Sequence, residues 1–92
     1  MHYEWDESKR AANFAKHGTD FIEAERFEWV TAIEAVDNRF DYGEERWVAL
    51  GCIGNRLHVL IYTRRKKSII RLISLRRANN REREYYEKKM QA

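Results

Sequence analysis

Arginines that stand among aliphatic residues are the first candidates for chemistry in this chain. Residues 56–77 read RLHVLIYTRRKKSIIRLISLRR, with Arg64, Arg71 and Arg76 set beside aliphatic side chains. An arginine in such surroundings needs an anionic partner, because burying an unpaired charge costs several kcal/mol. An internal carboxylate could be the partner of any one of them. Three arginines on neighbouring strands favour a shared site for an anion such as phosphate, since a guanidinium binds two phosphate oxygens at once.

Other residues could move protons at such a site. His17 is a candidate general base or acid, because the ordinary pKa of histidine lies near neutrality. Glu44 or Glu45 could be the base instead. Equally, His17 could only cap the C-terminal end of a helix, and Glu44 could only pair with an arginine. When the neighbouring 2′-hydroxyl is the attacking group, RNA cleavage needs a base, an acid and cations, but no metal.

Further residues could bind RNA without taking part in the chemistry. Lys16, Arg46 and Arg71 could contact phosphates, although Lys16 could also be simply solvated. Tyr62 and Tyr86 could stack on unpaired bases, as aromatic side chains do in RNA-binding sites. Packing in the core is the alternative for both tyrosines.

The charge is divided unevenly along the chain. The 92 residues carry a net charge of +3, but residues 1–55 hold 6 basic and 12 acidic residues, whereas residues 56–92 hold 12 basic and 3 acidic ones. The basic C-terminal part favours contact with a polyanion. Alternatively, the two parts neutralise each other across the fold.

Length and composition predict one domain, residues 1–92, in the cytoplasm. No apolar run approaches the roughly 20 residues that span a bilayer, and the N-terminus does not resemble a signal peptide. Cys52 is the single cysteine and is expected to be a buried apolar residue. No cofactor or metal is expected.

The elements that position these residues predict an α+β fold. Two N-terminal helices precede an antiparallel meander of about four strands, and a helix follows it. Period-two alternation places Arg71 and Leu75 on one face of the last strand and Arg76 on the other. The predicted helices begin at Asp6, at Asp20 and at Asn79 or Asn80. The predicted strands cover 32–36, 46–53 and the two halves of 56–77. Residues His2–Trp5 could form an additional edge strand at the N-terminus.

Several fragments resemble the BrnT family of toxins. They are KHG at 16–18 with the following DFIEA, YGEER at 42–46, Gly51, YTRR at 62–65 and RLISLRRANNREREYY at 71–86. One departure is Leu75, where the family's Ile-Ser-Ala-Arg pattern has alanine. The resemblance implies a RelE-like ribonuclease fold and inhibition of translation through RNA cleavage. It also implies a BrnA-like ribbon-helix-helix antitoxin, a toxin dimer in the antitoxin complex, and contact with operator DNA only through the antitoxin.

The predicted function is therefore metal-independent RNA cleavage by a toxin, with His17, Glu44, Arg64 and Arg76 in catalysis. Two other classes compete with it. A non-catalytic nucleic-acid-binding module would use the same basic face for affinity alone. An interaction protein would bind only an acidic partner there.

Overall fold

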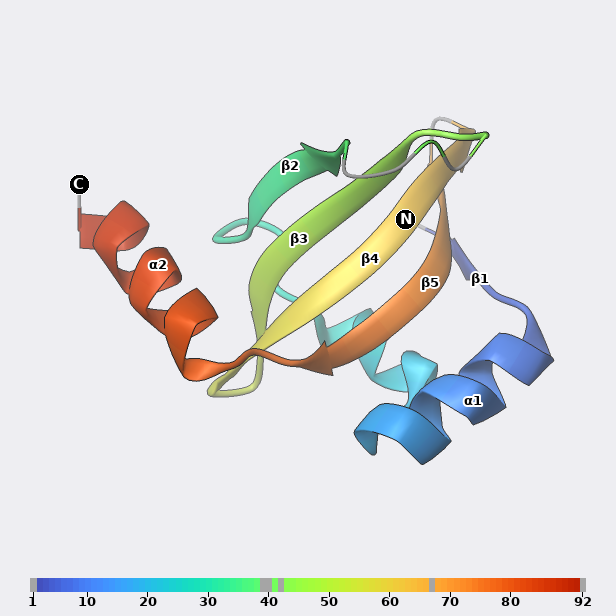
Figure 1. The fold of residues 1–92 in the computed structure, drawn as a ribbon, viewed down its shortest axis with the longest axis horizontal. Coiled ribbons are helices and arrows are strands. Elements are labelled where there is room, and N and C mark those ends of the chain that lie inside the picture. Colours follow the sequence, from blue (N-terminus) through green and yellow to red (C-terminus); the bar gives the residue numbers. More distant parts are fainter. Residues whose placement is uncertain (1, 39–40, 42, 67, 92) are drawn as a thin grey trace.

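Five strands form one sheet in the order β1-β5-β4-β3-β2 (Figure 1). The computed structural model describes residues 2–38, 41, 43–66 and 68–91. Tyr42 of the YGEER fragment and Lys67, between the two predicted strands of 56–77, therefore lie outside the described residues. The elements are β1 (His2–Glu4), α1 (Glu7–His17), the 3-10 helix η1 (Phe21–Arg26), β2 (Ile33–Asp37), β3 (Arg46–Ile53), β4 (Arg56–Lys66), β5 (Ile69–Arg77) and α2 (Asn80–Gln91).

The α+β class is confirmed, with one difference in the sheet. Strands β2 to β5 form the predicted antiparallel meander. The N-terminal strand β1 adds a fifth strand, which pairs with β5 in parallel and makes the sheet mixed. Parallel neighbours need a long connection, and here most of the chain separates the two strands.

Both faces of the sheet carry apolar residues, as the sequence of β4 predicted. On one face Leu60 and Tyr62 join the larger core together with Phe21 of η1. On the other face Leu57 and Val59 form a smaller cluster, against which Tyr86 of α2 packs. We call these the η1 face and the α2 face.

A β-bulge in β5 changes which residues share a face. Ser74 pairs with Ile61, but Leu72 pairs with Tyr62, so Ile73 is an extra residue on β5. The predicted alternation is therefore wrong across this point, because a bulge reverses the faces beyond it. Leu75 lies fully buried in the core of the η1 face instead of beside Arg71.

The second predicted helix is a short 3-10 helix rather than an α-helix. It begins at Asp20, as predicted, with a capping box: Asp20 accepts from the backbone N–H of Ile22, and Glu23 accepts from the Asp20 N–H. The helix ends early because Phe27 turns to extended backbone and forms a bridge with Ile53. The Phe27 ring lies directly over Gly51, where an added Cβ would be 2.4 Å from the ring.

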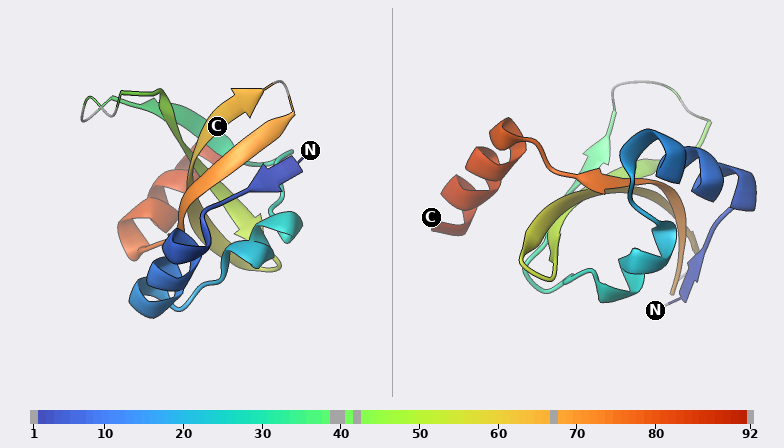
Figure 2. Two further views of the ribbon diagram at one scale, coloured as in Figure 1. Left: turned by 90° about the vertical axis from the view of Figure 1, so that its right-hand side faces the viewer. Right: turned by 90° about the horizontal axis from the view of Figure 1, so that it is seen from below.

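Asn13 joins α1 to the edge of β5 beyond the end of β1. Its side-chain amide donates to the carbonyl oxygen of Leu75 at 2.8 Å and accepts from the Leu75 N–H at 3.1 Å. The same amide nitrogen also donates to the carbonyl of Thr19 at 2.9 Å. These bonds satisfy backbone groups that a free sheet edge would expose, so α1 lies along β5 in a defined position (Figure 2).

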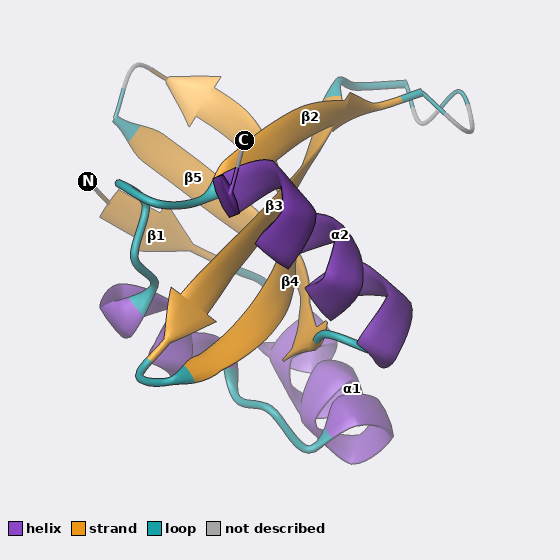
Figure 3. Ribbon diagram, turned by 90° about the vertical axis from the view of Figure 1, so that its left-hand side faces the viewer, coloured by secondary structure: helices purple, strands orange, loops and turns teal. Residues whose placement is uncertain are grey.

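The C-terminal helix α2 stands beside the sheet and has no buried residue (Figure 3). Asn79 caps it, and Glu82 accepts from the Asn79 N–H in return. Tyr86 faces the sheet and donates to the Thr31 carbonyl at 2.8 Å, whereas Tyr85 is exposed. Among the described residues no helix is long and apolar enough to cross a membrane.

Candidate active site

Three of the predicted cations share the α2 face. In the β4–β5 ladder, Arg76 lies opposite Val59 of the smaller apolar cluster. Arg71 lies opposite Thr63, whose side chain is on the other face from its buried neighbour Tyr62. On β3, side chains alternate between the two faces, so Arg46 is on the same face as Val48, which packs against the same cluster. The α2 face is therefore the basic face of the sheet.

Arg64 lies on the opposite face, which separates it from Arg46, Arg71 and Arg76. Its guanidinium carbon is 5.2 Å from the centre of the Trp47 ring and 5.6 Å from that of Tyr62. Nη2 also donates to Glu34 at 3.0 Å. These contacts give Arg64 a structural role on the η1 face and correct its predicted place beside Arg71 and Arg76.

The shared anion site predicted from the arginines is replaced by separate ion pairs. Arg71 contacts Glu4 at 3.4 Å. Arg76 binds Glu82 with two hydrogen bonds of 2.9 and 2.8 Å. Their partners on β4, Thr63 and Val59, are four positions apart, which corresponds to about 14 Å along the strand. The two arginines therefore face different parts of any bound RNA.

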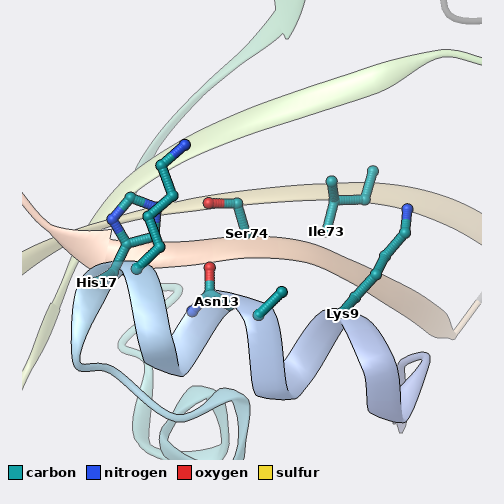
Figure 4. A pocket seen from close by; sticks show the side chains of 7 residues that line it. Lys9, Asn13, His17, Ile73 and Ser74 are labelled. Atoms are coloured by element: carbon teal, nitrogen blue, oxygen red, sulfur yellow. The ribbon is translucent and has the colours of Figure 1, made fainter.

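A groove runs between α1 and β5. It has a volume of about 290 Å³. Figure 4 shows Lys9 and His17 toward opposite ends of this groove, with Ile73 and Ser74 between them. Because Ile73 is the bulged residue, two consecutive side chains of β5 reach the groove. The α1–β5 groove is lined by Lys9, Ala12, Asn13, Lys16, His17, Ile73 and Ser74, so no carboxylate is among the described residues that line it.

The environment of His17 favours its neutral form. Burial lowers the pKa of its imidazole below the ordinary value, and the positive charges of Lys16 and Arg76 lower it further. The imidazole is therefore largely unprotonated at pH 7 and able to accept a proton. Lys16 and His17 thus line one end of the α1–β5 groove, and the charge of Arg76 reaches the imidazole from β5.

Glu44 belongs to a different part of the α2 face. Its carboxylate lies 3.9 Å from Nε of Arg46, and the carbonyl of the next residue, Glu45, accepts a 2.8 Å bond from Thr63. In the β4–β5 ladder Thr63 lies opposite Arg71, and Arg71 is toward the other end of β5 from Arg76. Glu44 and His17 are therefore too far apart to act on one phosphate. The predicted alternative, pairing of Glu44 with an arginine, fits this arrangement.

Tyr62 is not available to RNA, which corrects its predicted binding role. Its side chain is fully buried. The hydroxyl donates to Glu34, and the Trp29 ring meets the tyrosine ring edge to face at 5.4 Å between centres. Burial, then the Glu34 carboxylate, raises the pKa of this phenol well above its ordinary value. Tyr62 thus stays neutral and holds Glu34 toward Arg64.

Sequence reasoning missed Lys9, Ser74 and Glu82 as candidate site residues. Lys9 and Lys16 lie seven residues apart on a helix, which places them on one helix face, so this pair was visible in the pattern. The position of Ser74 depends on the bulge, which no local pattern marks. Glu82 could not be found from a local pattern, because its ion pair with Arg76 requires the turn between β5 and α2. No group of three potential metal-binding His, Cys, Asp or Glu residues is found within the described parts of the chain.

Comparisons with known proteins agree with the resemblance found in the sequence. The family model described as "Ribonuclease toxin, BrnT, of type II toxin-antitoxin system" matches residues 5–82. The 1.1 Å crystal structure of the Brucella abortus ribonuclease toxin BrnT is similar, with 30% identity and a TM-score of 0.65, and the match covers 87% of this chain and 100% of that one. A comparison with curated protein sequences gives no match. The chain therefore belongs to the BrnT family of ribonuclease toxins of type II toxin–antitoxin systems.

Proposed function

We propose that this toxin cleaves RNA without a metal ion, at the end of the α1–β5 groove that holds Lys16 and His17, with Arg76 of β5 as the further cation. The observation that carries the proposal is that His17 lines the α1–β5 groove while the charge of Arg76 contributes to the lowered pKa of its imidazole. When a 2′-hydroxyl attacks the adjacent phosphorus, it needs a neutral base to take its proton and a cation to stabilise the developing negative charge. A neutral imidazole and a guanidinium together meet these two needs.

The proposed reaction is a transesterification. His17 takes the proton of the 2′-hydroxyl, the 2′-oxygen bonds to phosphorus, and the bond from phosphorus to the 5′-oxygen breaks. The imidazolium returns the proton, through solvent, to the leaving 5′-oxygen. Arg76 binds the oxygens that gain negative charge, and Lys16 adds a second cation. The products are a 2′,3′-cyclic phosphate and a 5′-hydroxyl.

Other basic residues of the α2 face bind the RNA strand away from the reacting phosphate. Arg46 and Arg71 are half-buried, with 23% and 30% of their side chains exposed, and lie toward the opposite end of the face. Neutralising phosphates at several points gives affinity without base specificity. Tyr86 contributes by holding α2 against the sheet, through its bond to Thr31.

The proposed partner is a BrnA-like ribbon-helix-helix antitoxin that neutralises the toxin. A dimeric antitoxin joins two toxin chains, and operator DNA is contacted through the antitoxin alone. Family membership supports a protein antitoxin. The basic α2 face supports a partner segment that is acidic, because complementary charge speeds association and favours one partner over others.

The test is analysis of RNA product ends. Purified toxin without antitoxin is incubated with a structured RNA in excess EDTA, beside a His17→Gln variant. We expect 2′,3′-cyclic or 3′-phosphate ends and 5′-hydroxyl ends from the wild type, and a loss of about 100-fold or more in rate from the variant. Cleavage that stops in EDTA would contradict metal independence. Binding without cleavage, on free RNA and on ribosome-bound message, would favour the non-catalytic nucleic-acid-binding module.

A further inference from the structure

The end of the α1–β5 groove that holds Lys9 has no part in the proposed chemistry. Lys9 and Lys16 are seven residues apart on α1, which separates their Cα atoms by about 10 Å. A stacked strand rises about 3.4 Å per nucleotide, so the two ammonium groups meet different phosphates of one strand. Lys16 lies at the end occupied by His17, and Lys9 lies at the other.

The groove has the composition of a nucleotide subsite. Two cationic side chains line it, Ala12 and Ile73 supply apolar surface, and Ser74 supplies a hydroxyl from the strand. Such a surface binds a sugar or base through the apolar part, and binds a phosphate through the cation. None of the described residues that line the groove carries a carboxylate, which would repel phosphate.

We propose that the α1–β5 groove is a subsite for single-stranded RNA beyond the cleaved bond, with Lys9 as the contact to a phosphate further along the strand. This subsite rests on the proposed function, because it extends the same RNA strand beyond His17. It makes the toxin favour substrates that continue past the cleaved bond over a dinucleotide.

The walls of this subsite are fixed before RNA binds. Asn13 is only 7% exposed and links the middle of α1 to both backbone groups of Leu75. Gly18 ends the helix with a φ of 72°, and its N–H donates to the Phe14 carbonyl at 2.8 Å. A site on rigid elements does not spend binding energy on ordering itself.

The subsite is tested by binding, with RNA that cannot be cleaved. Dissociation constants are measured for a 2′-O-methyl dinucleotide and a 2′-O-methyl tetranucleotide, at several salt concentrations. The proteins are wild type, Lys9→Gln and the control Lys88→Gln, which removes the same charge from the exposed surface of α2. Backbone amide shifts of Ile73 and Ser74 report whether RNA occupies the groove.

We expect Lys9→Gln to weaken tetranucleotide binding about fivefold, as for one exposed charged contact. The slope of log Kd against log salt should fall by about 0.7, and dinucleotide binding should stay unchanged. Lys88→Gln should match the wild type for both ligands.

The subsite would be overturned if both variants bound the tetranucleotide equally well, or if RNA shifted backbone amide signals only outside the groove. Either result would leave the nuclease proposal intact. RNA bound in the groove by a protein that cleaves no RNA would overturn the nuclease and keep the subsite. No binding of either RNA by the wild type would overturn both.

Discussion

Arg76 and Glu82 form a two-point ion pair that ties the end of β5 to the first turn of α2. Nη1 and Nη2 of the arginine donate to separate oxygens of the carboxylate, at 2.9 and 2.8 Å. Glu82 also accepts from the Asn79 N–H at the start of the helix. In the proposed mechanism, the reacting phosphate competes with this carboxylate for the guanidinium. In that mechanism Glu82 would both stabilise α2 and compete with RNA for Arg76.

Replacing Glu82 should separate stability from RNA binding. Glu82→Gln keeps an oxygen for the Asn79 cap but removes the charge opposite Arg76. We expect the free energy of unfolding at pH 7 to fall by about 1 kcal/mol, while affinity for RNA rises. Denaturant unfolding and RNA binding are measured on the same preparations, with Glu84→Gln on the same helix as control. A variant that loses both stability and RNA affinity would refute the competition.

The same ion pair should make stability depend on pH. Its guanidinium partner lowers the pKa of Glu82 below the ordinary value. The stabilisation is therefore complete above the unfolded-state pKa of about 4.3 and is lost as the pH falls through the folded-state pKa. The difference in unfolding free energy between wild type and Glu82→Gln should accordingly shrink from pH 6 toward pH 3. A constant difference over this range would show that the carboxylate charge is not responsible.

The cleavage rate should report the protonation of His17. Burial and the nearby cations Lys16 and Arg76 lower the pKa of this imidazole. Because the proposed base acts when neutral, the rate should rise with pH through an inflection below pH 6.5 and then level off. Arg76→Lys keeps one charge near His17 and should retain the inflection. His17→Gln should abolish it; an unchanged inflection in that variant would assign it to another group.

Asn13 should be the most sensitive polar residue of the fold. Asn13→Ala removes three hydrogen bonds and leaves Thr19 and Leu75 backbone groups without them, so we expect a loss of about 2–4 kcal/mol in unfolding free energy. Asn13→Asp keeps the acceptor for the Leu75 N–H and should fall between. Equilibrium unfolding in urea checks this order. A loss below 0.5 kcal/mol, roughly the level of a surface change, would contradict the linking role.

Most elements of this fold could be predicted from local patterns. Asp6, Asp20 and Gly18 mark helix ends because each satisfies backbone groups within a few residues, and period-two apolar runs mark the strands. The capping box at Asp20 predicted where η1 begins. Its short length depends on Phe27 reaching Ile53, a contact between distant parts of the chain.

The site was harder to predict because it depends on which face each arginine occupies. One extra residue at Ile73 moved Leu75 into the core and placed Arg76 on the same face as Arg71. Arg64 was expected beside them, yet its strand position directs it to Trp47 and Tyr62. Residue types identified His17 and Arg76, but their proximity arises only when α1 docks along β5.

The central claim is tested most directly by comparing two arginines that sequence alone treats as equivalent. RNA cleavage in excess EDTA is measured for wild type, Arg76→Ala and Arg64→Ala, with unfolding curves to confirm that each protein is folded. The account predicts a loss of about 100-fold or more in rate for Arg76→Ala, because its cation binds the reacting phosphate. Arg64→Ala should lose stability but keep a rate within a few-fold of wild type. The reverse result, with Arg76→Ala active and Arg64→Ala inactive, would contradict it.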